Sequence, residues 1–379
     1  MADSNATNTP WRIYLYGAGS IAWRHGVAAQ SLGEDVELFA ADPSQDARES
    51  LLSKVPKATV YQDAQDMLAS SPGRARDIVV VAVPPFLHHA ATLRAFASGR
   101  HVLCEKPLAT SETEMAEMLA ASDAAGRILS ECSFRYLGNG ALERARQLIE
   151  TGGVGSVYHT RFVNRQPRSR AGIEYQPASR WFLQRDKSGG GTLFDWGVYD
   201  MTMFFDVVRP VAVTVNYAWL ATPKTDIDPT DPPISVETHA GASLTLTLDS
   251  GAVVPFHWER ASGFHGETQV AINIDGTAGG LTWEWVPTFD YKAEVDAAQE
   301  GFKLTYYTDK NGEVDAEEYK FPGFGWEDAN HRPLLAFVDL IEGRESLALS
   351  RSRMEFNFGV VLAIYKSASE GKPIHVQLK

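Results

Sequence analysis

The sequence RIYLYGAGSIA, residues 12–22, joins an apolar run to a glycine turn and then to the first residues of a helical pattern. Gly17 permits a tight turn, Gly19 lets the backbone approach a pyrophosphate, and the small Ala22 lets a helix pack closely on a strand. The first N–H groups of the helix would then face the phosphates. A glycine turn before a helix is equally compatible with a purely structural role. The flanking sequence therefore has to distinguish dinucleotide binding from a structural turn.

The pattern that surrounds this turn is typical of a parallel sheet with helices on both faces. Gly33, Gly99 and Gly126 stand where helix C-caps favour a positive φ, and Ser111 with Glu114 forms a capping box. The expected strands cover residues 12–16, 36–41, 77–83, 101–105 and 128–134, and the expected helices cover 20–32, 86–98 and 111–125.

A carboxylate follows the second expected strand. Asp42 lies 25 residues beyond Gly17, where an acidic side chain in a dinucleotide-binding unit would bind the ribose 2′-hydroxyl. It would repel a 2′-phosphate, which favours NAD over NADP. The alternative is that Asp42 only caps a helix or a turn ahead of Pro43. The predicted cofactor residues of this region are Gly17, Gly19, Ser20, Ile21 and Asp42.

The second part of the chain has a different texture, with alternating and β-branched runs separated by turn residues. We expect an α+β domain with a large, mostly antiparallel open sheet, one helix over 191–207, a surface loop over 222–233 and helices over 333–342 and 354–369. The predicted divisions are a disordered tail at 1–10, an NAD-binding Rossmann domain at 11–135 and a substrate and oligomerisation domain at 136–379. Its C-terminal helices, 333–370, are expected to pack toward the first domain. The expected strands are 157–163, 211–220, 235–249, 252–260, 268–275, 281–286 and 303–308.

Charge and cysteine content exclude several classes of function. The chain of 379 residues has 35 basic and 48 acidic side chains, a net charge of −13, which disfavours binding to nucleic acid or to an anionic membrane surface. Two cysteines, Cys104 and Cys132, support neither a disulfide framework nor a cysteine-rich zinc site. We predict no metal. The N-terminus has no signal-peptide pattern, which indicates a cytoplasmic protein.

Further motifs resemble those of the Gfo/Idh/MocA oxidoreductases. They are Gly17-Ala18-Gly19 with His25, Val83-Pro84-Pro85 with His88, and the run GRHVLCEKP at residues 99–107. The sequence GGGTLFDWGVYD at residues 189–200 resembles that family's glycine-rich entry to a helix of the substrate domain. The resemblance covers nearly the whole chain after residue 11, and it adds Pro84, His88, Glu105 and Lys106 to the predicted cofactor residues.

The resemblance also implies a catalytic Lys, Asp and His around a substrate alcohol. The Lys is Lys106 and the Asp is Asp195, but the position of the His holds Tyr199. Branches of the family similar to glucose–fructose oxidoreductase and dihydrodiol dehydrogenase carry Tyr there, so the departure leaves activity possible and puts the identity of the proton-transfer group in question. His25 and His88 are better explained as positioning backbone or cofactor.

The chemistry of these three side chains suits hydride transfer from a secondary alcohol, because the hydroxyl proton must leave to a nearby base. Asp195 and Tyr199 are four residues apart and face one side of a helix. Lys106 ends a strand, where doubly wound sheets bind ligands, and its ammonium would stabilise an alkoxide. The alternatives are a core tyrosine, a helix-capping aspartate and a surface lysine.

Six arginines lie between residues 161 and 185 and lead into the glycine run before Asp195. They favour either a solvated or subunit-contact loop, or recognition of an anionic substrate group beside an aromatic sugar platform. The substrate residues predicted on the second interpretation are Arg165, Arg180, Trp181 and Trp196.

Three functions remain open from the sequence. The first is an NAD-dependent enzyme that oxidises or reduces a sugar, cyclitol or glycoside. The second is an NAD-dependent glycosidase that oxidises a ring hydroxyl, eliminates the aglycone, adds water and reduces the ketone again. The third is a non-catalytic NAD sensor. We expect a small carbohydrate substrate and a homo-dimer or homo-tetramer formed through the open sheet.

Overall fold

The computed structural model describes residues 9–167, 177–222, 234–286 and 301–379. The backbone contacts divide the chain into two compact units. Unit 1 contains residues up to Arg135 together with Trp326–Met354, and unit 2 contains Tyr136–Gly325 and Glu355–Lys379. No helix within the described ranges is both long and apolar enough to cross a membrane.

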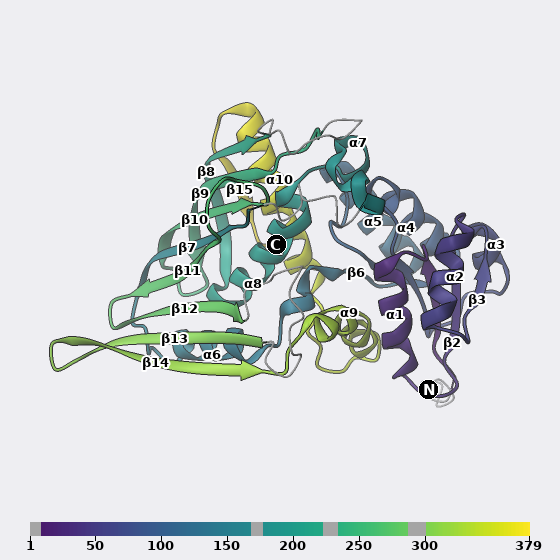
Figure 1. The fold of residues 1–379 in the computed structure, drawn as a ribbon, viewed down its shortest axis with the longest axis horizontal. Helices are drawn as coiled ribbons and strands as arrows, with labels where there is room; N and C mark the ends of the chain where they lie inside the picture. The colour runs from purple at the N-terminus through teal and green to yellow at the C-terminus, as the bar shows by residue number, and fades with distance from the viewer. Residues whose placement is uncertain (1–8, 168–176, 223–233, 287–300) are drawn as a thin grey trace. The chain divides into compact units, whose positions relative to one another are not determined.

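Unit 1 is a doubly wound α/β domain, which confirms the predicted Rossmann fold. Its six parallel strands lie in the order β3-β2-β1-β4-β5-β6, and β2, β3 and β6 are labelled in Figure 1. The strands are β1 Arg12–Tyr16, β2 Glu37–Ala41, β3 Thr59–Tyr61, β4 Asp77–Val81, β5 His101–Cys104 and β6 Leu129–Glu131. The helices are α1 Ser20–Gln30, α2 Gln45–Lys54, α3 Ala64–Ala69, α4 His88–Ala97, α5 Glu112–Ala125 and α9 Trp326–Ile341.

The core of unit 1 explains these elements. β1 and β4 are apolar along almost their whole length because helices cover both faces of the sheet. Leu334, Phe337 and Val338 of α9 complete the same core, packed with β1 and α1. α9 runs through Pro333, whereas the sequence favoured a start at that proline. The positive φ expected at Gly33, Gly99 and Gly126 is confirmed.

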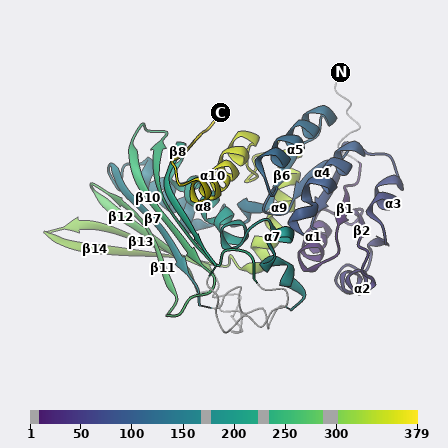
Figure 2. The same cartoon turned by 90° about the horizontal axis from the view of Figure 1, so that it is seen from above.

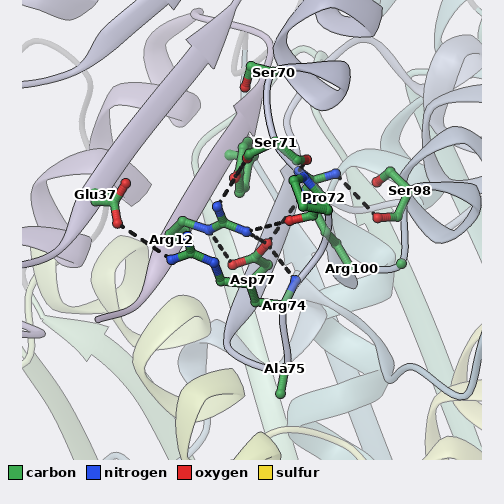
Figure 3. A network of polar contacts seen from close by, with 12 residues as sticks. Arg12, Glu37, Ser70, Ser71, Pro72, Arg74, Ala75, Asp77, Ser98 and Arg100 are labelled. Carbon is green, nitrogen blue, oxygen red and sulfur yellow. Dashed lines mark hydrogen bonds and ion pairs between the residues drawn. The ribbon is translucent and has the colours of Figure 1, made fainter. Parts of the chain in front are cut away.

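A buried ion-pair network lies at the amino ends of β1 and β4, the sheet edge opposite to the glycine turn (Figure 3). Arg12 donates to both oxygens of Asp77, over 2.7 and 2.5 Å. The Arg100 Nε lies 3.4 Å from Asp77 Oδ2, and its Nη2 donates to the Ser71 carbonyl. All three charged side chains are almost fully buried, so removal of any one of them would leave a buried charge without its partner.

Unit 2 is an α+β domain, as predicted, built on a nine-stranded sheet in the order β14-β13-β12-β11-β7-β10-β9-β8-β15. Only β7 and β10 run parallel to each other; the other neighbours are antiparallel. The strands are β7 Val157–Arg165, β8 Pro210–Ala221, β9 His239–Leu248, β10 Val253–Ala261, β11 Gln269–Gly276, β12 Gly279–Val286, β13 Gly301–Lys310, β14 Glu313–Pro322 and β15 Ile374–Gln377.

The helices of unit 2 are α6 Gly140–Glu150, α7 Arg185–Ser188, α8 Val198–Val208 and most of α10 Arg351–Glu370. Of these, α8 and α10 lie along one face of the sheet (Figure 2). Phe204 of α8 stacks on Phe256 of β10 at 4.4 Å between ring centroids, which defines the covered face. The predicted helix 191–207 begins instead with a π-helical turn, Leu193–Gly197, and continues as α8. The predicted loop 222–233 lies outside the described residues except at its first position.

Candidate active site

The turn between β1 and α1 has the geometry of a phosphate-binding loop. Gly17 has φ +109°, and a Cβ there would come within 2.5 Å of the Ala82 carbonyl oxygen, so only glycine fits. Gly19 precedes α1 and is open on its Cβ side, with no heavy atom within 4 Å. No side chain of the described residues caps this helix, so its first N–H groups remain available to an anion.

Asp42 stands directly after β2 and is fixed against this turn. Its Oδ2 accepts the Ala18 N–H at 2.9 Å, and its Oδ1 accepts the Ser44 N–H at 2.9 Å. Arg48 of α2 donates to the Asp42 carbonyl. The carboxylate is half-buried and each oxygen keeps a further lone pair. These residues therefore fit a dinucleotide whose ribose bonds Asp42.

Glu105 lies at the end of β5 in a buried network. Arg135 donates to both Glu105 oxygens at 2.6 and 2.8 Å, and the His25 ring lies 2.9 Å from Oε1. Burial alone would raise the pKa of Glu105, but the Arg135 charge and His25 lower it well below the usual range. Asn330 of α9 accepts from Arg135 at 2.7 Å. The network fixes the strand end that carries Lys106, itself half-buried.

His25, Glu105 and Cys132 have donor atoms within 4.8 Å of one another. Arg135 already occupies the carboxylate, and burial raises the pKa of the Cys132 thiol well above its usual value. A divalent metal would have to displace the arginine cation, so we assign no metal here.

His88 lies between two turns of unit 1. Its Nδ1 is 2.8 Å from the Pro107 carbonyl and its Nε2 is 2.8 Å from the Val83 carbonyl. Burial lowers the pKa of His88, although both hydrogen bonds oppose that effect. The ring thereby connects the turn that contains Pro84 to the turn that contains Lys106. This placement suits the positioning role that the sequence suggested for His88.

In unit 2, the structure brings Asp195, Trp196 and Tyr199 together around the start of α8. Asp195 is 7% and Tyr199 3% exposed. The Tyr199 ring meets the Trp196 ring at 5.6 Å and the Tyr136 ring edge-on at 5.1 Å. π-Helical turns such as the one that carries Asp195 are frequent at functional sites. The sequence did not indicate Tyr136, which adds a second phenol to this cluster.

The residue after Tyr199 anchors α8 to the sheet. Asp200 is fully buried and accepts from Arg260 at 2.5 and 2.6 Å and from the Trp258 indole N–H at 3.0 Å. The Arg260 guanidinium also lies 5.3 Å from the centroid of the Trp196 ring. Arg260 was not among the six arginines that the sequence singled out.

The structure describes only part of the predicted arginine site. Arg165 lies on the face of the sheet opposite to α8, where its Nε is 3.4 Å from Glu259 and its Nη1 donates to Gln269. We therefore remove Arg165 from the predicted substrate residues. Arg180 is exposed. Arg185 lies 3.7 Å from Glu237, so two of the six arginines already have protein carboxylates. Arg168 and Arg170 lie outside the described residues.

Trp181, from the same part of the chain, stacks on its neighbour Phe182 at 3.8 Å. One ring face is therefore already in use, and a sugar could stack only on the other. Of the four predicted substrate residues, Trp196 alone is placed by these contacts beside Tyr199.

The fold and the glycine turn define a dinucleotide-binding protein. The NAD-binding Rossmann model of the Gfo/Idh/MocA oxidoreductase family matches residues 11–132, and the C-terminal domain model of the same family matches residues 142–282. The chain therefore belongs to the Gfo/Idh/MocA oxidoreductase family, and the resemblance seen in the sequence is confirmed.

Known proteins are similar to this chain over more than half of its length. D-glucoside 3-dehydrogenase of Escherichia coli is 25% identical over 98% of this chain and 99% of its own. A 2,7-anhydro-N-acetylneuraminate hydratase of the same organism is 28% identical over 59% of this chain and 58% of its own. The structure of a levoglucosan dehydrogenase in complex with NADH and levoglucosan covers 97% of this chain and 100% of its own, with a TM-score of 0.74 and 21% identity.

Proposed function

We propose that this chain is an NAD-dependent oxidoreductase that moves a hydride between the cofactor and a secondary alcohol of a sugar, cyclitol or glycoside. The observation that carries the proposal is the Gly17–Gly19 turn with Asp42 held across it by the Ala18 N–H. The similarity to a glucoside dehydrogenase supports a carbohydrate substrate. Bound NAD would supply the hydride acceptor or donor.

The side chains divide the remaining work. Lys106 stabilises the negative charge that develops on the substrate oxygen as its proton leaves. Tyr199 in its phenolate form accepts that proton and becomes a phenol, and Asp195 orients the sugar by hydrogen bonding. The aromatic rings of Tyr136 and Trp196 exclude water from the phenol. Asp195 remains the other candidate for proton transfer.

Replacement of the two proposed proton and charge groups tests these roles. A positioned acid, base or alkoxide stabiliser contributes roughly 10²–10⁴ in rate, so Lys106→Ala and Tyr199→Phe should each lose most turnover on a panel of sugars and glycosides. NAD affinity, measured by calorimetry, should stay within about tenfold of the wild type. Near-normal activity of Tyr199→Phe would move the proton-transfer role to Asp195.

Cofactor preference depends on Asp42. Its carboxylate repels a 2′-phosphate, and the neighbouring Arg48, which donates to the Asp42 backbone carbonyl, would remain as a cation near that phosphate once the carboxylate is removed. Asp42→Ser should therefore shift the ratio of NADP to NAD affinity toward NADP, with Asp46→Ser, an acidic residue of the first turn of α2, as a charge-matched control. Tighter binding of NADP than of NAD by the unmodified chain would contradict the assignment.

The redox-neutral glycosidase is the second candidate, favoured by the similarity to a hydratase. In that reaction, oxidation of one ring hydroxyl acidifies the adjacent C–H, elimination expels the aglycone, water adds to the double bond, and the hydride returns to the ketone. Absorbance separates the two candidates, because NADH accumulates only in the net oxidation. Release of free aglycone without NADH accumulation would support the glycosidase.

A further inference from the structure

A buried glutamate meets the start of the helix that carries Asp195 and Tyr199. Glu237 lies two residues before β9 and is 1% exposed. Its Oε1 accepts the N–H of Gly191 at 2.9 Å and that of Leu193 at 3.2 Å. Its backbone carbonyl accepts the N–H of Thr192 at 3.0 Å. One residue therefore satisfies three successive N–H groups.

These N–H groups need a partner because the first turn of a helix has no internal acceptors for them. Ordinarily the N-cap side chain supplies one, but the N-cap Thr192 makes no side-chain hydrogen bond of that kind. The acceptor comes instead from the segment before β9, more than 40 residues further along the chain. A Cβ at Gly191 would overlap the Glu237 carbonyl oxygen, so glycine is required for this approach.

Tyr365 of α10 holds the same carboxylate from the other side. Its hydroxyl donates to Glu237 Oε1 at 2.5 Å, and its ring meets Phe194 edge-on at 4.7 Å. A Cβ at Gly190 would overlap the Tyr365 hydroxyl. The glycine run therefore fits between the segment before β9, which carries Glu237, and α10, which carries Tyr365.

We propose that Glu237, supported by Tyr365, is a positioning residue that fixes Asp195 and Tyr199 for the reaction proposed above, on which this inference rests. Asp195 follows two residues after Leu193, and its N–H bonds the Gly191 carbonyl at 2.9 Å. Any displacement at Gly191–Leu193 is therefore passed to Asp195 through one helical hydrogen bond. A misplacement of about 1 Å can cost on the order of 10²-fold in rate.

Three variants test the acceptor. Glu237→Ala removes it and should lower kcat by about 10- to 100-fold, with the Kd for NAD within about twofold of the wild type. Glu237→Gln keeps a carbonyl oxygen for both N–H groups and should restore kcat to within about threefold. Tyr365→Phe leaves the acceptor in place and should fall between them. Hydrogen exchange of the amides at 191–193 should rise in Glu237→Ala and stay low in Glu237→Gln.

The control is Asp63→Ala, which removes the cap of α3 in unit 1. Asp63 Oδ1 accepts the Gln65 N–H at 2.6 Å and the Asp66 N–H at 3.3 Å. This variant should lower the thermal midpoint while kcat stays unchanged. The inference is overturned if Glu237→Ala keeps wild-type kcat, if Glu237→Gln is as slow as Glu237→Ala, or if Asp63→Ala slows turnover equally. Absence of any sugar turnover in the wild type would instead overturn the proposed function, and the assignment with it.

Discussion

Two buried glutamates at the ends of neighbouring strands show that the neighbouring side chains determine the pKa of a buried carboxyl. Arg135 and His25 outweigh burial at Glu105 and lower its pKa. Glu131, at the end of β6, accepts from the hydroxyl and the N–H of Ser133. Burial therefore raises the pKa of Glu131 from 4.5 to about 7, and the Ser133 hydrogen bonds oppose that rise without cancelling it.

This difference predicts a pH dependence of stability. Between pH 4.5 and pH 7 the folded chain keeps a proton on Glu131 that the unfolded chain has lost. Folding therefore loses about 1.4 kcal/mol for each pH unit of rise through that window. Glu131→Gln cannot titrate, so the unfolding free energy of the wild type minus that of the variant should fall by about 3 kcal/mol from pH 4.5 to pH 7.

The measurement is urea unfolding of both proteins at several pH values. The comparison has to be a difference, because the His101 pKa is lowered to about 4, chiefly by burial. In the folded state His101 is neutral down to that pH, so its contribution to stability rises with pH below its ordinary value of 6.5 and masks the Glu131 slope in the wild type. A constant difference between wild type and variant would show that Glu131 is already ionised in the folded chain.

At the scale of elements, the turn between β1 and α1 depends on the positive φ of Gly17 and on its close approach to the Ala82 carbonyl. Gly17→Ala should destabilise the fold by more than the about 1–3 kcal/mol of a strained backbone, because its Cβ also meets the Ala82 carbonyl. NAD affinity should fall by at least about tenfold, since the loop N–H groups move. Urea unfolding and calorimetry measure the two effects.

Gly33→Ala is the control for this turn. Gly33 ends the segment after α1 at φ +131°, and no heavy atom lies within 4 Å of its Cβ position. The Gly33→Ala variant should lose only the part of the unfolding free energy that the strained backbone costs, and it should bind NAD as tightly as the wild type. Equal NAD affinity of Gly17→Ala and the wild type would mean that this turn does not contact the cofactor.

Elements with strong local signals were predictable, and those without were missed. β1, β4 and β5 are apolar runs, and α5 has its capping box, so each was found to within two residues. α2 buries only Leu51, β3 has three residues, and β14 is exposed and acidic along most of its length; none shows a period that the sequence reveals. α3, α6 and β15 were likewise not predicted.

The candidate site shows the same limit at longer range. The glycine turn, Asp42 and Lys106 lie in motifs whose spacing carries the chemistry. Glu237 meets Tyr365 across 128 residues and Arg260 meets Asp200 across 60, and no local spacing reports such pairs. Arg165 was misassigned because clustering in the sequence does not report which face of the sheet a side chain occupies.

At the scale of the whole molecule, a net charge of −13 makes copies of this chain repel one another. Over β8–β10, the face of the unit 2 sheet opposite to α8 carries little of that charge. Its one carboxylate on β8–β10, Glu259, lies against His239 at 2.8 Å and Arg165 at 3.4 Å. Tyr217 is 61% exposed there, and Trp219 lies over Gly241. Aromatic side chains on a nearly neutral surface are typical of subunit interfaces.

We therefore expect a homo-dimer or homo-tetramer formed through this face, measured by light scattering on a sizing column. Tyr217→Glu adds a like charge to the face of both copies, so it should shift the protein toward monomer, most strongly at low salt where screening is least. Leu347→Glu is the control, since Leu347 is an exposed apolar residue of unit 1 at 40% exposure. A monomeric wild type, or dissociation by Leu347→Glu as well, would show that the sheet face does not hold the subunits together.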